Sequence, residues 1–211
     1  MLSRRPHPAG FTLIELLTVI VIVGIIAAIL LPGLNSSRAA AAKAQTRVQF
    51  AQWAAAIGAY RQEYGAYPTF DASGLVNAGA TADPASPHCF HDLLAGRRRD
   101  GTPLPDAAGA DPRSPEAQNR RRLVFFSFNP AEFTPDHLLQ DASGNTDIAV
   151  LVDRNLDGTI DGNDYPGGWP AVRGLRPTAA EIATTGLRLG VAFYAPAPGA
   201  TTEQPGFVVS W

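Results

Sequence analysis

The chain has only one cysteine among its 211 residues, Cys89, so it cannot form an internal disulfide. Any globular domain in this sequence must therefore be stable without one. His88, Cys89 and His91 lie close together in sequence, but two ligand types within four residues, with no second cluster elsewhere, are a poor basis for a closed metal site. We expect these three side chains to be unrelated residues that are packed or exposed, and not a metal site. The sequence also shows no internal repeat and no pairing of a nucleophile with a base, so we expect no enzymatic activity.

Charge is almost absent from the segment 11–31, in which Glu15 is the only charged residue. As a helix, these 21 residues would be about 31 Å long, which matches the hydrocarbon core of a bilayer. The segment is therefore predicted to be the transmembrane part of a helix. A carboxylate within hydrocarbon is costly, so Glu15 is expected to have a functional role with a specific partner.

The residues before and after Gly10 form a recognisable motif. A short basic leader, residues 1–10, ends at Gly10 and is followed by Phe11-Thr12-Leu13-Ile14-Glu15. This motif resembles the N-terminus of type IV prepilins and type II secretion pseudopilins. The resemblance implies that a prepilin peptidase cuts after Gly10 and that the new amine of Phe11 is methylated. It also implies that Glu15 faces that amine on a neighbouring subunit when the helices stack into a filament.

The residue chemistry agrees with this role, because cleavage would place an ammonium group at membrane depth, where it and Glu15 would each need a counter-charge. The alternative is a secretory signal peptide, but the apolar run is too long and no small-residue cleavage site follows it promptly. Basic residues on the two sides of the run are nearly balanced, so charge alone does not set the topology. The resemblance implies a single-pass protein of the bacterial inner membrane with its head in the periplasm.

Beyond the span, residues 32–65 are predicted to form the periplasmic half of the same helix, kinked or locally melted at Pro32 and Gly33. Aromatic and aliphatic residues then recur every three or four positions, which predicts a helix face buried against a globular domain; they are Phe50, Trp53, Ile57, Tyr60 and Tyr64. Gly65 and Pro68 are expected to end the helix. The stretch 60–68 also resembles the helix ending of the major pseudopilin of type II secretion.

The remaining sequence is expected to be rich in loops. Residues 66–122 are interpreted as a variable loop region with a short helix at 91–94, and residues 123–211 as a β-sheet head. Strands are predicted at 123–128, 148–153, 187–194 and 207–211. The expected fold class is α+β, a pilin-like fold with a long N-terminal helix packed on a small antiparallel sheet. The arginine clusters at 97–99 and 120–122 are expected to be solvated or to contact an acidic patch of a neighbouring subunit, and no nucleic-acid partner is expected.

Acidic residues gather in one part of the head. Residues 132–164 contain eight acids and one arginine, a net charge of −7. Within them, the segment 153–164 fits the calcium-loop pattern of the EF-hand, with a glycine, Gly158, at the sixth position. The predicted ligands are Asp153, Asn155, Asp157, Thr159 (through its backbone carbonyl), Asp161 and Asp164. A polar turn whose side chains cap their own backbone is the alternative. The resemblance supports calcium, since major pseudopilins carry calcium near their C-terminal sheet.

Taken with the resemblance, these features predict a pseudopilin subunit of a type II secretion system. Its expected partners are further copies of the chain in a periplasmic filament, other pseudopilins, the prepilin peptidase and methylase, and the inner-membrane secretion platform. Its expected cofactor is structural calcium. A subunit of a type IV pilus or a DNA-uptake pilus, or a minor pseudopilin, would share the N-terminal features. A membrane-tethered glycan-binding head is a further alternative, because Tyr165 and Trp169 flank the acidic segment.

Overall fold

The computed structural model describes residues 11–71, 73–178 and 186–211, and of residues 29–36 it describes the backbone alone. The predicted leader, including Gly10, lies outside the described residues. The chain divides within its first helix into two units, one extending to Ala41 and the other comprising Ala42–Trp211. We call the second unit the head.

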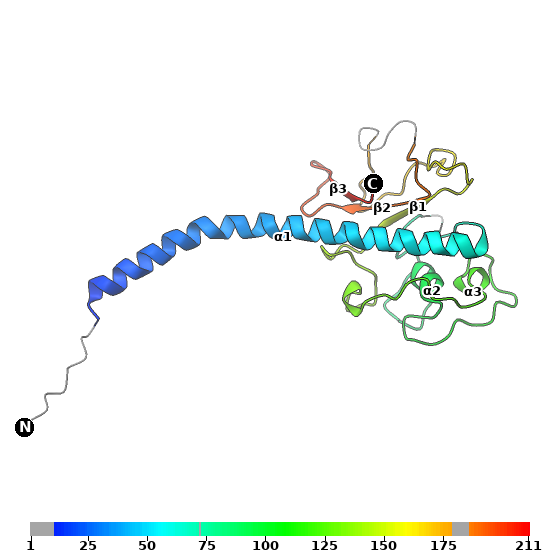
Figure 1. Ribbon diagram of the computed structural model, residues 1–211, viewed down its shortest axis with the longest axis horizontal. Coiled ribbons are helices and arrows are strands. Elements are labelled where there is room, and N and C mark those ends of the chain that lie inside the picture. Colours follow the sequence, from blue (N-terminus) through cyan, green and yellow to red (C-terminus); the bar gives the residue numbers. More distant parts are fainter. Residues whose placement is uncertain (1–10, 72, 179–185) are drawn as a thin grey trace, which may run out of the picture. The chain divides into compact units, whose positions relative to one another are not determined.

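Helix α1, Leu13–Tyr64, is 52 residues long and contributes to both units (Figure 1). Its backbone remains helical through Pro32 and Gly33, so the local melting predicted at these residues is not observed. A proline removes one intrahelical hydrogen bond, and the turns on either side can continue across that loss. The helix ends as predicted: Gly65 has a φ of 79°, a conformation that glycine adopts readily, and its N–H donates to the Arg61 carbonyl at 2.8 Å.

The sheet of the head has three antiparallel strands in the order β1-β2-β3. They are β1 (Ala149–Val152), β2 (Val191–Pro196) and β3 (Phe207–Val209). Ala149 lies opposite Tyr194, and Tyr194 lies opposite Val209. The outer edge of β1 is covered by residues 74–76, since Val150 N–H donates to the Gly74 carbonyl and Val76 N–H to the Ile148 carbonyl, each at 2.8 Å.

The predicted α+β class is therefore confirmed, but one predicted strand is wrong. Residues 123–128 are not a strand; instead, the N–H groups of Phe125 and Phe126 both donate to the Leu94 carbonyl, at 2.8 and 3.0 Å. The aromatic residues that suggested a strand instead pack against the hydrophobic core, as the rings of Phe125 and Phe126 do. The predicted short helix is confirmed and slightly longer, as α2, Cys89–Ala95.

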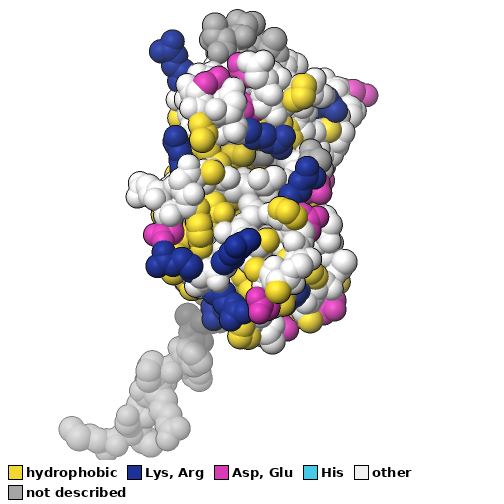
Figure 2. Space-filling view, turned by 90° about the vertical axis from the view of Figure 1, so that its right-hand side faces the viewer, with side chains coloured by type: hydrophobic (Ala, Val, Ile, Leu, Met, Phe, Trp, Pro, Cys, Tyr) yellow, Lys and Arg dark blue, Asp and Glu magenta, His cyan; other side chains and the backbone are white. Residues whose placement is uncertain are grey.

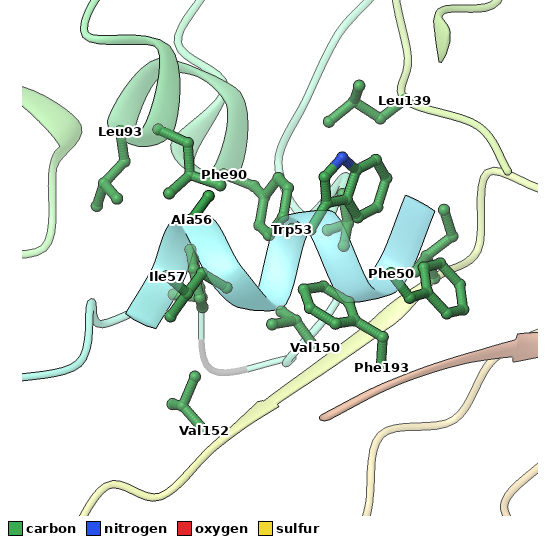
Figure 3. Close-up of a cluster of buried hydrophobic side chains, with 14 of the residues drawn as sticks. Phe50, Trp53, Ala56, Ile57, Phe90, Leu93, Leu139, Val150, Val152 and Phe193 are labelled. Carbon is green, nitrogen blue, oxygen red and sulfur yellow. The ribbon is translucent and has the colours of Figure 1, made fainter. Parts of the chain in front are cut away.

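The core of the head forms where α1 lies between the sheet and α2, and Figure 3 shows the side chains that meet there. Trp53 is fully buried, with its ring centroid 5.2 Å from that of Phe90 and 5.7 Å from that of Phe193. The predicted apolar face of α1 is thus confirmed for Phe50, Trp53, Ile57 and Tyr60, while Tyr64 is partly buried. Burial of aromatic side chains of this size supplies much of the free energy that holds a small domain together.

Two short helical segments and a buried polar network organise the long loops. The segments are α3 (Pro115–Gln118) and the 3-10 helix η1 (Pro130–Glu132). Arg99 donates to the carbonyls of Thr81, Asp83, Ser86 and His137, at 2.6 to 3.2 Å. His88 and Asp92 are buried nearby, and His88 N–H donates to Asp92 Oδ2 at 3.0 Å. His88 and Asp92 therefore belong to the packed interior of the head.

Candidate functional site

The first candidate site is the beginning of α1. Thr12 precedes the helix, and both its N–H and its hydroxyl donate to Glu15 Oε2, at 2.9 and 2.7 Å. Glu15 N–H donates back to the Thr12 hydroxyl oxygen at 3.3 Å. This reciprocal arrangement is a capping box, which satisfies N–H groups that a helix start leaves without partners. Thr12 and Glu15 are both exposed, so the Glu15 carboxylate remains accessible to a second molecule.

The apolar residues that follow are not covered by the part of the chain that the structure describes. The large apolar side chains between Phe11 and Ile26 are each 51% to 82% exposed. An apolar surface of this extent is unusual for a monomer in water and indicates an interaction with lipid or protein. Among the residues that the structure describes, no helix meets the combined length and hydropathy requirement of a membrane-crossing segment. The side chains of 29–31, which complete the predicted span, are outside the described part.

Residues 5–31 match the prokaryotic N-terminal methylation motif. The match includes the Gly10–Phe11 junction and Glu15, the residues that the sequence identifies for processing and assembly. It supports a type IV pilin-like subunit that is processed by a prepilin peptidase and assembles into pilus-like filaments. No curated protein and no solved structure matches the chain.

The second candidate site is the acidic loop, residues 153–164, which directly follows β1. Its backbone turns as the calcium-loop pattern requires, because Gly158 has a φ of 87°. Gly158 N–H donates to Asp153 Oδ2 at 2.9 Å. Ile160 is fully buried and exchanges two backbone hydrogen bonds with Leu187, at 2.8 and 2.9 Å, which anchors the loop to the core. No local pattern in the sequence indicates this partner, which lies 27 positions later.

Two buried carboxylates organise the loop. Asp164 Oδ1 accepts from the backbone N–H groups of Arg154 and Asn155, at 2.8 and 3.2 Å, and Asp164 Oδ2 accepts from Asp161 N–H at 3.0 Å. Asp153 is 1% exposed, and its Oδ1 is buried without a hydrogen-bond partner. A buried carboxylate oxygen with no donor costs free energy unless a cation or water satisfies it. A cation bound next to Asp153 Oδ1 would satisfy this oxygen.

The other predicted ligands make local contacts. Asn155 Oδ1 accepts from Asp157 N–H at 3.0 Å, Asp157 Oδ1 from Thr159 N–H at 2.8 Å, and Asp161 Oδ1 from Asn163 N–H at 2.7 Å. Within the described ranges, no group of three or more His, Cys, Asp or Glu side chains is arranged to hold a metal ion. The predicted ligands are therefore not brought together as a ready-made metal site in the described part of the chain.

Tyr165 connects the acidic loop to the sheet, a role that no pattern in the sequence indicates. Its hydroxyl oxygen accepts from Val152 N–H at 2.8 Å, and the Arg154 guanidinium lies 4.5 Å from the centre of its ring. Burial raises the pKa of the Tyr165 hydroxyl above its ordinary value, so it stays protonated. Tyr165 is 6% exposed, and Trp169 packs against Tyr194 with ring centroids 6.3 Å apart. These two residues therefore contribute to the packing of the head.

Proposed function

We propose that this chain is a pseudopilin subunit of a type II secretion system, held in the inner membrane by the apolar half of α1 with its head in the periplasm. The observation that carries the proposal is the methylation motif at 5–31 with one acid, Glu15, in an otherwise uncharged apolar run. In this function Gly10 and Phe11 form the processing site. Further copies of the chain, joined through their apolar helices, form the filament that drives protein export.

The exposed carboxylate of Glu15 supports this assignment. A processed neighbour would present the ammonium group of Phe11 at the same depth, and a pair of opposite charges placed there would fix the register of two parallel helices. The capping box keeps the carboxylate at the first turn of α1 before that contact forms. The exposed apolar surface of the same segment then provides most of the contact area.

We further propose that the acidic loop binds calcium as a structural ion through Asp153, Asn155, Asp157, Asp161, Asp164 and the Thr159 carbonyl. The unpartnered Asp153 Oδ1 supports this assignment. Four carboxylates and one amide within twelve residues are oxygen ligands of the type that calcium prefers. When bound, the ion would neutralise repulsion between these carboxylates and fix the loop to β1.

The absence of an internal disulfide favours a pseudopilin over a surface pilus subunit, which is the second candidate.

Two measurements test the proposal. Mass spectrometry of the mature protein is expected to show an N-terminus at methylated Phe11, and a retained Met1 would overturn the filament interpretation. Deletion of the gene in its native host is expected to abolish protein secretion; loss of surface pili or DNA uptake with normal secretion would favour the second candidate.

A further inference from the structure

One segment from a later part of the chain contacts both halves of the acidic loop. We call this segment, residues 186–190, the backing segment. Leu187 exchanges two backbone hydrogen bonds, at 2.8 and 2.9 Å, with Ile160 in the second half of the loop. At the other end of the segment, the Gly190 carbonyl accepts from Asp153 N–H, at the start of the loop, at 3.0 Å. A short stretch of continuous backbone therefore limits how far the two halves of the loop can separate.

Gly186 lies so close to the loop that no side chain fits at this position. An added Cβ would lie 2.7 Å from Thr159 Cγ2, 2.9 Å from Asp161 Cβ and 2.9 Å from the Ile160 carbonyl oxygen. Each of these distances is shorter than a van der Waals contact, and one of the three atoms belongs to the backbone, so the loop would have to move. Thr159 and Asp161 are both predicted ion ligands. The absence of a side chain at Gly186 therefore determines where two of the ligands lie.

The backing segment is itself fixed to the rest of the head. Leu187 is buried in the hydrophobic cluster on the same side of the sheet as Ile160. Gly190 packs against the Tyr67 hydroxyl so closely that no side chain fits there either. The Tyr67 hydroxyl oxygen accepts from Arg61, in the last turn of α1, at 2.8 Å. The segment is thus held at the end of α1 and provides a fixed support for the loop.

Local placement of oxygens, and not overall charge, decides the affinity of this loop for a cation. Figure 2 looks onto the end of the head at which α1 ends, where Asp and Glu side chains are intermixed with Lys and Arg side chains. A face of mixed charge exerts little net attraction on a cation. Calcium binds its oxygen ligands at about 2.3–2.6 Å, so displacement of one half of the loop relative to Asp153 takes ligands out of that range.

We propose that Gly186 is a positioning residue for calcium: because it has no side chain, the backing segment holds the Thr159 carbonyl and Asp161 where they reach an ion bound at Asp153. This inference rests on the calcium binding proposed above and adds a residue that is not a ligand. The backing segment, Gly-Leu-Arg-Leu-Gly, has no carboxylate of its own. Substitution of residues that hold metal ligands in place typically weakens metal binding about 10- to 100-fold.

Calcium titration of the full chain in detergent tests this role. Gly186→Ala is expected to weaken calcium binding about 10- to 100-fold, measured by calorimetry. Terbium(III), which replaces calcium and is excited through nearby aromatic rings, is expected to coordinate more water in this variant, measured from its luminescence lifetimes in H2O and D2O. Gly199→Ala is the matched control: Gly199 has the same φ of 81°, but an added Cβ there meets nothing within 4 Å among the described residues beyond its chain neighbours. The control is expected to keep the affinity and the hydration of the unmodified chain.

The possible results separate positioning from other effects. Equal calcium affinities of Gly186→Ala and the unmodified chain would overturn the proposal, and so would equal weakening in Gly186→Ala and Gly199→Ala. A role in stability alone would lower the melting temperature in chelator and leave affinity and terbium hydration unchanged. Absence of calcium binding by the unmodified chain would refute the proposed ion together with this inference, whereas the filament function would stand.

Hydrogen exchange of the unmodified chain provides a second measurement, which does not depend on the folding of a variant. Leu187 N–H donates to the Ile160 carbonyl, and opening of this bond releases the ligand-bearing half of the loop. At a calcium concentration of about 100 times the Kd, exchange of this N–H is expected to slow by up to about 100-fold. Gly101 N–H, which donates to the Arg98 carbonyl in an exposed turn, is the control and is expected to exchange at an unchanged rate. If the chain binds calcium and Leu187 N–H exchanges equally fast with calcium and with chelator, the proposal is overturned, even where Gly186→Ala does not fold.

Discussion

Thr12 and Glu15 bind each other reciprocally at the start of α1, through two hydrogen bonds to the Glu15 carboxylate and one to the Thr12 hydroxyl. The same carboxylate is the one that we assign to the contact with a neighbouring Phe11 amine. Glu15 thus has a local role, which needs a hydrogen-bond acceptor, and an intermolecular role, which needs a negative charge. Substitution can separate the two.

Glu15→Ala removes both roles, and we expect the chain to be processed at Gly10 but to assemble poorly. Glu15→Gln is the matched control, because glutamine at this position of a capping box still accepts the Thr12 N–H but has no charge. We expect Glu15→Gln to assemble as poorly as Glu15→Ala. Sheared filaments quantified by immunoblot against processed protein in the membrane provide the measurement. Normal filaments from Glu15→Gln would assign the residue to helix capping alone.

Calcium removal tests the acidic loop. At a calcium concentration of about 100 times the Kd, binding to the folded state alone would add about 2.7 kcal/mol to the free energy of unfolding. For a protein of this size, that corresponds to a melting temperature about 5–10 °C higher. We expect a chelator to lower the melting temperature of the full chain in detergent by this amount, and added calcium to restore it.

Two aspartate substitutions are matched controls for this measurement. Asp153→Asn keeps the shape of the side chain that carries the unpartnered oxygen but removes its charge, and is expected to abolish the response to chelator. Asp136→Asn, at an exposed site outside the acidic loop, is expected to keep the full response. If chelator does not change the melting temperature of the unmodified chain, the proposed calcium site is contradicted.

Local patterns in the sequence predicted much of this structure. The spacing of Phe50, Trp53 and Ile57 gave the buried face of α1, and Gly65 gave its end, because both depend on residues a few positions apart. The segment 123–128 was misread as a strand, because aromatic residues favour strands and cores alike. The contact of Ile160 with Leu187 and the close approach of Gly96 to the Arg122 backbone depend on the folded path of the chain, which no local pattern encodes.

The packing of Trp53 gives a prediction for the stability of the head. Trp53 is fully buried among Phe50, Phe90 and Phe193, so its truncation removes buried apolar area and leaves a cavity. We expect Trp53→Ala to lower the free energy of unfolding by about 3–5 kcal/mol, measured by denaturant unfolding of the full chain in detergent. Val48→Ala, on the same helix but 59% exposed, is the control and is expected to change it by less than about 0.5 kcal/mol. Equal effects of the two variants would contradict the proposed core.

The last prediction concerns the pH dependence of stability and rests on His88. His88 Nε2 lies 3.0 Å from Asn77 Oδ1, and His88 Nδ1 accepts from His91 N–H at 3.3 Å, so the ring is neutral with its proton on Nε2. Burial, with the nearby Arg99 and His91, lowers the pKa of His88 from 6.5 to about 3. Between these values the unfolded chain binds a proton at this residue that the folded chain does not bind. The stabilising contribution of neutral His88 is therefore complete above about pH 6.5 and is lost progressively as the pH falls toward 3.

One proton taken up on unfolding corresponds to a slope of about 1.4 kcal/mol per pH unit in the free energy of unfolding. We expect His88→Gln, which cannot titrate, to reduce the measured slope between about pH 4 and pH 6 by up to that amount, even if the variant is less stable at every pH. His137→Gln is the control, because His137 is exposed and its side chain is not part of the buried network. An unchanged slope in His88→Gln would mean that His88 is protonated in the folded head. That result would contradict the neutral ring indicated by the hydrogen bond from His91 N–H to His88 Nδ1.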